Sequence, residues 1–261
     1  MSGILIIQTA YLGDVVLTTP LIKAAKKRFG SKEVAALVIP SGAEILGWPN
    51  NPVAGLDTII IYDKRGEERG IGAFIQKIKE IRQRKFDVCL SPHCSARSTM
   101  LATMAGIPLR VGFNSNALGF LYTHRVPRLD GIHEVEKNLH LLNPFGGVPD
   151  GFVPHPEVAV SDKGKEKTER LLAEAPPGEI LIGIAPGSVW GTKRWPPERF
   201  ALVINLLHKG IGASFVLLGG PGDIESASAV RQASRVSVLD LAGKTSISEM
   251  TAVITRLNLF I

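Results

Sequence analysis

The sequence lacks the signatures of several common protein classes. No apolar run in its 261 residues approaches the roughly 20 residues that a helix needs to cross a bilayer, so we do not expect an integral membrane protein. The first residues have neither a basic region nor a small-residue cleavage pattern and look like a core strand, so we expect the protein to stay in the cytoplasm. Helix-turn-helix signatures and basic runs interleaved with aromatic residues are also missing, so no nucleic-acid partner is expected.

Several motifs of catalysis and cofactor binding are missing as well. The chain has no G-x-S-x-G nucleophile elbow, no G-x-x-x-x-G-K-[ST] phosphate loop and no G-x-G-x-x-G fingerprint. It also lacks a D-x-D pair to hold a divalent metal against a diphosphate, so fixed cations and helix N-termini would have to neutralise such a ligand. The two cysteines, Cys89 and Cys94, make no zinc pattern even with His93 beside Cys94. We therefore expect neither a metal nor a cofactor.

The charge balance, in contrast, is clearly basic. The formal net charge is +6 and the isoelectric point is about 9.4, which favours an anionic partner such as nucleic acid, acidic lipid or a phosphorylated small molecule. Charge alone does not choose among these partners. The basic stretch 64–85 has apolar residues at helical spacing, so we interpret it as an amphipathic surface helix with a solvated basic face.

Apolar runs alternate with helix-like segments in two series. Strands are predicted at 4–9, 34–40, 58–62 and 86–91, and then again at 179–186 and 213–220. Helices are predicted between and after them, at 21–29, 42–48, 71–85, 196–210 and 246–257. This alternation predicts parallel sheets covered by helices on both faces, an α/β fold. Pro20 should bend the first helix or delay its start.

A segment rich in proline and glycine, 143–164, separates the two series and is typical of a linker or crossover. The sequence thus predicts two doubly wound domains, 1–155 and 156–261, with a ligand cleft at the carboxyl ends of their strands. The chain ends in "NLFI", which resembles the first half of a buried strand. We therefore expect the second domain to be incomplete and the sequence to be truncated.

Three segments at strand-to-helix junctions carry candidate functional residues. The first, "LGDVV", places Asp14 at a helix start, where an aspartate is either a cap or a catalytic carboxylate. The second, "APGSVWGTKRWP", combines glycines with Ser188, Thr192 and Lys193, which suits an anionic phosphate but also a plain loop with surface cations. The third, "LLGGPGD", is a glycine-rich strand exit and weak evidence alone.

Six segments together resemble the ADP-heptose:lipopolysaccharide heptosyltransferases, which form glycosyltransferase family 9. They are "GDVVLTTPLIKAA", "SPHCSARSTMLATMAGIPLRVGF", "HEVEKNLHLL", "PGSVWGTKRWPPERFALV", "LLGGPGD" and "LAGKTSISEM". Their order and spacing match the family along nearly the whole chain, and "PG…TKRWP" followed by "LAGKTS" is quite specific. The resemblance implies a GT-B fold with two Rossmann-like domains, an N-terminal one for the acceptor and a C-terminal one for the nucleotide-sugar.

The resemblance also implies a reaction, the inverting transfer of a heptose from ADP-heptose to the inner core of lipopolysaccharide without a metal. Asp14 would be the general base that takes a proton from the acceptor hydroxyl. Lys193 would neutralise charge on the leaving diphosphate. The acidic lipopolysaccharide core would be the acceptor, and it would be met at the cytoplasmic surface of the inner membrane.

The remaining candidate residues receive binding roles from the same resemblance. Those implied to bind the donor are Gly187, Ser188, Thr192, Asp223, Lys244, Thr245 and Ser246. Gly13 and Arg97 are implied to bind the acceptor. His133 also matches the family pattern, and we expect its role to be structural.

The sequence departs from the family at its end. In the family, a strand like "LNLFI" leads into a donor-binding loop that reads roughly N-D-S-G-x-x-H, and here the sequence stops before it. Two alternatives therefore stay open. One is a catalytically inactive remnant that binds acidic glycolipid or a partner protein, although the presence of Asp14 and Lys193 counts against it. The other is a GT-B enzyme that uses a different nucleotide-sugar.

Overall fold

The computed structural model describes residues 3–30, 32–47, 49–176, 178–188 and 190–261. The helix predicted at 42–48 and the motif at 185–196 include Trp48 and Val189, which lie outside the described residues. The chain divides into two compact units, Met1–Ala159 and Val160–Ile261, and the division falls within the proline- and glycine-rich segment 143–164.

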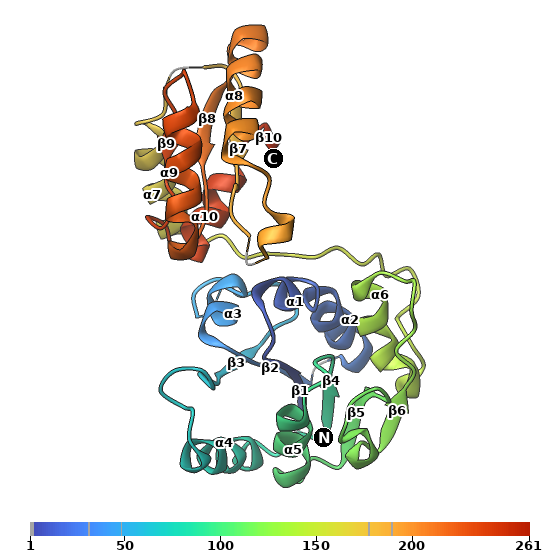
Figure 1. The fold of residues 1–261 in the computed structure, drawn as a ribbon. Coiled ribbons are helices and arrows are strands. Elements are labelled where there is room, and N and C mark those ends of the chain that lie inside the picture. The colour runs from blue at the N-terminus through green and yellow to red at the C-terminus, as the bar shows by residue number, and fades with distance from the viewer. Residues whose placement is uncertain (1–2, 31, 48, 177, 189) are drawn as a thin grey trace. The chain divides into compact units, whose positions relative to one another are not determined.

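A six-stranded parallel sheet forms the core of the first unit (Figure 1), in the order β3-β2-β1-β4-β5-β6. Its strands are β1 (Gly3–Gln8), β2 (Glu33–Val38), β3 (Thr58–Ile61), β4 (Val88–Ser91), β5 (Leu109–Phe113) and β6 (His124–Val126). β1 is buried along its whole length, as a central strand covered on both faces must be. The strand order reverses beside β1, so the carboxyl ends of β1 and β4 form the switch point where sheets of this kind bind ligands.

Helices cover both faces of this sheet (Figure 1). On one face, α4 (Ile71–Gln83) and α5 (Ala96–Met104) pack through Ile78, Ile81 and Leu101. The other face carries α1 (Leu12–Val16), α2 (Thr19–Phe29), α3 (Pro40–Ile45) and α6 (Glu134–Leu139). Pro20 is predicted to bend the first helix or delay its start, and the structure has a break instead: α1 ends at Val16 and Pro20 lies in the first turn of α2, where its missing N–H costs no helical hydrogen bond.

The second unit contains a four-stranded parallel sheet in the order β10-β7-β8-β9. Its strands are β7 (Leu181–Ile184), β8 (Ser214–Leu217), β9 (Leu239–Asp240) and β10 (Leu259–Phe260), and its helices are α7 (Asp162–Leu172), α8 (Pro197–Ile211), α9 (Ile224–Ala233) and α10 (Ile247–Ile254). Side chains alternate along β8, so that Phe215 faces α8 and α9 while Val216 faces α7 and α10. The α/β fold with two parallel sheets, predicted from the alternating pattern, is confirmed.

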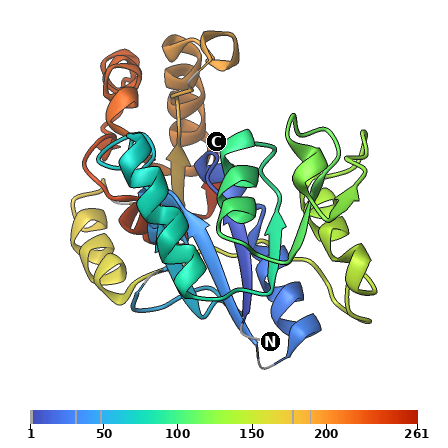
Figure 2. The ribbon, with the colours of Figure 1, turned by 90° about the horizontal axis from the view of Figure 1, so that it is seen from below.

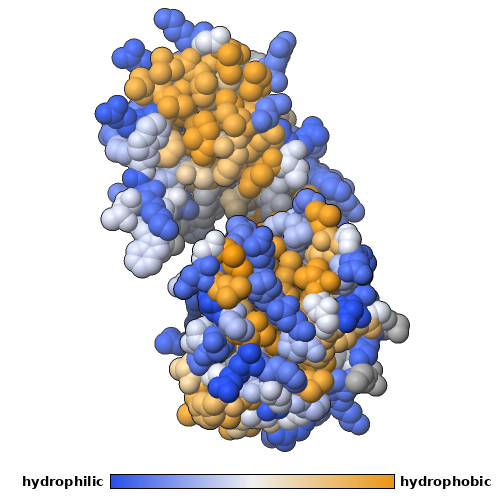
Figure 3. All heavy atoms as spheres, turned by 90° about the vertical axis from the view of Figure 1, so that its right-hand side faces the viewer, coloured by the Kyte–Doolittle hydropathy of each residue, from blue (hydrophilic) through white to orange (hydrophobic). Residues whose placement is uncertain are grey.

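The burial predicted for the strand at "NLFI" is wrong. β10 lies at the edge of its sheet beside β7, and both Leu259 and Phe260 are about half exposed. An edge strand receives cover from fewer neighbours than a central strand, which explains the exposure. Figure 3 shows a broad apolar surface on the second unit. Within the described ranges, no helix is both long and apolar enough to cross a membrane.

Candidate active site

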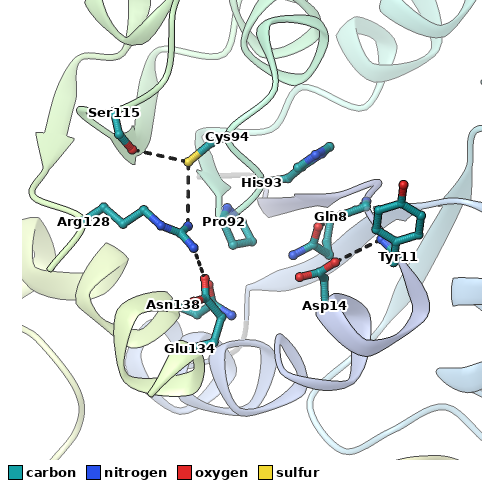
Figure 4. A pocket seen from close by; sticks show the side chains of 11 residues that line it. Gln8, Tyr11, Asp14, Pro92, His93, Cys94, Ser115, Arg128, Glu134 and Asn138 are labelled. Atoms are coloured by element: carbon teal, nitrogen blue, oxygen red, sulfur yellow. Dashed lines mark hydrogen bonds and ion pairs between the residues drawn. The ribbon is translucent and has the colours of Figure 1, made fainter. Parts of the chain in front are cut away.

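A cavity of about 490 Å³ lies in the first unit at the carboxyl ends of β1 and β4 (Figure 4). It therefore occupies the switch point of the six-stranded sheet. The side chains around it come from five places in the chain, namely the exits of β1, β4, β5 and β6 and the helix α6. The lining residues are Gln8, Ala10, Tyr11, Asp14, Pro92, His93, Cys94, Ser115, Arg128, Glu134 and Asn138.

Asp14 reaches this cavity because α1 begins directly after β1. The backbone N–H of Tyr11 donates a hydrogen bond of 3.1 Å to Asp14 Oδ2, so one of the N–H groups at the start of α1 that lack a helical partner is satisfied. Among the described residues, no hydrogen bond engages Oδ1. The carboxylate therefore caps its helix with one oxygen and leaves the other available to a ligand, so the cap does not exclude a chemical role.

The Thr9 hydroxyl joins Lys64 to His93 beside the same cavity. Lys64 Nζ donates to Thr9 Oγ1 at 3.0 Å, and Thr9 Oγ1 lies 3.2 Å from His93 Nδ1. An ammonium can only donate, so Thr9 accepts from Lys64, and its own hydroxyl proton remains free to be donated. Burial lowers the pKa of His93, the positive charge of Lys64 lowers it further, and the Asp14 carboxylate opposes the shift. The lowered pKa favours the neutral form of His93 near pH 7.

Three cations gather next to this hydroxyl, and we call Lys64, Arg65 and Arg97 the cationic cluster. Burial lowers the pKa of Lys64, and the positive charges of Arg65 and Arg97 lower it further. The guanidinium of Arg65 lies 4.8 Å from the ring centroid of Tyr11, and that of Arg97 lies 5.6 Å from the ring centroid of Phe74. The structure therefore places Arg97 in a positive group beside the cavity rather than in its wall.

The other side of the cavity holds a charge that is already paired. Arg128 Nη2 donates to Glu134 Oε1 at 2.6 Å, and Arg128 Nη1 lies 3.8 Å from the exposed Cys94 Sγ. Gly13 lies on α1 with open space around the position of a Cβ, and it is not among the lining residues. His133 Nδ1 accepts from the Val135 N–H at 3.3 Å and so caps α6, which is the structural role expected for it.

In the second unit, the candidate donor residues come from three loops at the carboxyl ends of β7, β8 and β9. The first two loops touch, because a Cβ at Gly187 would overlap the Asp223 carboxylate. Asp223 Oδ2 accepts from the Gly220 N–H at 2.9 Å, and the Gly243 N–H donates to the Gly219 carbonyl at 2.9 Å. The structure thus brings residues of all three loops together at one edge of the sheet.

The loop after β7 carries Ser188, Thr192 and Lys193. Ser188 Oγ accepts from the Trp190 N–H at 3.2 Å, and the Ser188 carbonyl accepts from Arg194 Nε at 2.7 Å. These bonds shape the loop ahead of η3 (Gly191–Lys193), where Thr192 and Lys193 are exposed. Lys193 has no ion-pair partner in the part of the chain that the structure describes, so its charge is available to an anion.

The loop after β9 carries Lys244, Thr245 and Ser246. Lys244 Nζ donates to the Asp240 carbonyl at 2.7 Å, which turns the ammonium back onto its own loop. Ser246 Oγ accepts from the Glu249 N–H at 3.3 Å, while Glu249 Oε2 accepts from the Ser246 N–H at 2.8 Å, so Ser246 forms a capping box on α10. Thr245 Oγ1 is buried and has no hydrogen-bond partner among the described residues.

Sequence reasoning missed several residues beside the first-unit cavity. Lys64 and Arg65 follow the end of β3, and His93 follows the end of β4. The rule that ligands bind at the carboxyl ends of parallel strands could have found all three. Glu134 lies at the start of α6, to which the rule about strand ends does not apply. Its position beside the cavity is seen only in the structure, where it pairs with Arg128.

Solved structures share this fold over nearly the whole chain. A family 9 glycosyl transferase from Veillonella parvula matches with a TM-score of 0.90 at 23% identity, covering 99% of this chain and 75% of that one. The ADP-heptose lipopolysaccharide heptosyltransferase II of Escherichia coli matches with a TM-score of 0.79 at 22% identity, covering 99% of this chain and 78% of that one. The fold is that of the GT-B glycosyltransferases.

The family follows from the sequence match. The model of glycosyltransferase family 9 (heptosyltransferase) matches residues 75–261, and the chain belongs to this family. Lipopolysaccharide heptosyltransferase 3 of Escherichia coli is 28% identical over 257 residues, which cover 95% of this chain and 74% of that protein. The chain is thus a glycosyltransferase of the lipopolysaccharide heptosyltransferase type, and the resemblance drawn from its motifs is confirmed.

Proposed function

We propose that this glycosyltransferase moves a heptose from ADP-heptose to the acidic inner core of lipopolysaccharide, with inversion at the anomeric carbon and without a metal or cofactor. The observation that carries the proposal is the Asp14 carboxylate in the switch-point cavity, with one oxygen held by the Tyr11 N–H. The relatives supply the substrates, since one is named an ADP-heptose lipopolysaccharide heptosyltransferase.

In this mechanism Asp14 acts as the general base. Its Oδ1 takes the proton of an acceptor hydroxyl while that oxygen attacks the anomeric carbon of the heptose. The bond between that carbon and the ADP oxygen breaks on the opposite face, so the configuration inverts. The hydrogen bond from the Tyr11 N–H fixes the other oxygen, which orients the carboxylate before the acceptor arrives.

The donor residues belong to the three loops of the second unit. Lys193, whose ammonium has no ion-pair partner among the described residues, would balance the charge that grows on the leaving diphosphate. Gly187, Ser188 and Thr192 would lie beside the phosphates, and the buried Thr245 hydroxyl would find a partner in the donor. Asp223, Lys244 and Ser246 would shape the adenosine side of the same loops, because their side chains already bond within them.

The acceptor would bind at the cationic cluster. Lys64, Arg65 and Arg97 lie beside the cavity, and burial of Lys64 strengthens its interaction with an anion. The inner core of lipopolysaccharide carries carboxylates and phosphates, which guanidinium groups bind in bidentate geometry. Gly13, next to Asp14, leaves open space for the acceptor. The reaction would take place in the cytoplasm, at the surface of the inner membrane that holds the acceptor.

The test compares Asp14→Asn with Asp130→Asn, a matched change at an exposed aspartate outside the cavity. We expect Asp14→Asn to lower heptose transfer by about a hundredfold or more without changing ADP-heptose affinity in calorimetry, and Asp130→Asn to change neither. Lys193→Ala should weaken ADP-heptose binding. Transfer that survives in Asp14→Asn, or a wild-type chain that binds UDP- or GDP-sugars in preference to ADP-heptose, would refute the proposal.

A further inference from the structure

The helices α4 and α5 lie side by side on one face of the six-stranded sheet (Figure 2), and both expose large apolar side chains. On α4, Ile71 is 80% and Ile75 is 45% exposed. On α5, Met100 is 38% and Met104 is 46% exposed. Exposed apolar side chains that gather in one place, rather than singly, mark a surface that binds something.

Helical spacing gathers the exposed apolar side chains of each helix on one flank, and two contacts join the helices. Ile71, Ile75, Lys79 and Arg82 share one flank of α4, and Arg97, Met100 and Met104 share one flank of α5. The helices run parallel, because Arg97 lies over Phe74 near their N-termini and Arg82 donates to the Met104 carbonyl near their C-termini. We call these seven flank residues the α4–α5 strip.

The charge of the strip has one sign. Lys79, Arg82 and Arg97 are its only charged members, and all three are basic. The nearby Glu80 lies on another flank of α4, where its carboxylate pairs with Lys77 and Arg84. Isoleucine and methionine side chains among cations fit the boundary between the headgroups and acyl chains of an anionic bilayer. Protein interfaces instead favour aromatic residues and contain little lysine, and the strip has no aromatic member.

The position of the strip relates it to the cavity. α5 begins at Ala96, just after Cys94 in the cavity wall, so the Arg97 end of the strip adjoins the cavity. The Met104 end lies about 10 Å further along the helix. A bilayer against the strip would therefore hold a lipid-anchored acceptor with its sugars close to Asp14.

We propose that the α4–α5 strip docks this protein on an anionic lipid bilayer. The inference identifies the surface through which the membrane association of the proposed function would occur. It rests on the proposed function only for the reason why the protein would dock there. Apolar side chains supply insertion into the acyl boundary, and the three cations supply attraction to the headgroups. Binding should therefore weaken when salt is raised.

The test is flotation of the full chain with vesicles of phosphatidylglycerol and phosphatidylcholine, without donor or acceptor. Ile71→Ser/Ile75→Ser should weaken binding at least about tenfold, since it removes two inserting side chains. Lys79→Glu should weaken it at least about fivefold. Matched controls change exposed residues of the second unit, Leu206→Ser/Ile211→Ser and Lys163→Glu, and should bind as the wild type does.

Each outcome decides the proposal independently of catalysis. Loss in the strip variants with unchanged thermal unfolding and unchanged controls supports docking by the strip. Equal binding to pure phosphatidylcholine, equal loss in the controls, or wild-type binding by the strip variants would overturn it. Self-association through the strip without vesicle binding, measured by mass photometry, would overturn it as well, because the strip would then cover a second copy. A failed transfer reaction leaves this measurement unaffected.

Discussion

Replacing Gly187 by alanine should damage the junction of the donor loops. A Cβ at this position would overlap the carboxylate of Asp223 and approach its Cβ, so a rotation of the side chain alone cannot relieve the contact. Displacing Asp223 also weakens its hydrogen bond from the Gly220 N–H. Overpacking costs about 1–3 kcal/mol, and a partly exposed bond to a carboxylate contributes about 1 kcal/mol. We therefore expect Gly187→Ala to lower the free energy of unfolding of the second unit by about 2–3 kcal/mol.

Gly191→Ala is the matched control, because a Cβ at Gly191 in the same loop meets nothing within 4 Å. Urea denaturation gives the stability, and calorimetry should show ADP-heptose binding at least about tenfold weaker in Gly187→Ala alone. The background Asp223→Gly adds a sharper check. It removes the Asp223 Cβ as well as the carboxylate, and with them every atom that the new Cβ would overlap, so Gly187→Ala should then cost little and the two changes should be strongly non-additive. Equal costs for the two glycines, or additive costs with Asp223→Gly, would refute the reasoning.

Two further predictions concern the first-unit cavity. Burial and the Lys64 charge lower the pKa of His93, so between that lowered pKa and about 6.5 the unfolded chain binds a proton that the folded chain does not. The free energy of unfolding should therefore fall as the pH drops below about 6.5. His93→Gln should flatten this dependence, measured by urea denaturation at several pH values. An unchanged slope would contradict the buried environment of His93. Burial raises the pKa of the Cys89 thiol to about 12, whereas Cys94 is exposed at the cavity, so a thiol reagent should modify Cys94 alone in the native protein. Cys94→Ser should abolish this fast reaction, and rapid modification of Cys89 would contradict the packing of β4.

The strands and helices could be predicted from the sequence because local patterns determine them. The continuous apolar run of β1 could be recognised as a buried parallel strand, and Pro20 indicated an irregularity near the start of the first helical segment. The burial of β10 could not be predicted, because an apolar run does not say whether its strand is central or at an edge. That information depends on the order of the strands in the sheet.

The candidate site could be predicted only in part for the same reason. Asp14 and Lys193 stand in motifs that can be read along the chain. The cationic cluster combines residues after β3 with a residue of α5, and these segments are about 30 residues apart in the sequence, so their proximity depends on the tertiary fold. Lys64 in isolation looked like part of a solvated basic helix, whereas the structure places it against Thr9 beside the cavity.

The three loops of the second unit are joined mainly through glycines. Gly219 and Gly243 share a main-chain hydrogen bond, and Gly187 and Gly220 rest on a single side chain, Asp223. The frame of the loops is therefore independent of the identities of the exposed Thr192 and Lys193. Under the proposed function, mutations at these two positions would alter the binding of the diphosphate while the architecture of the loops persists, so a scaffold of this kind is open to divergence in nature and to directed evolution in the laboratory.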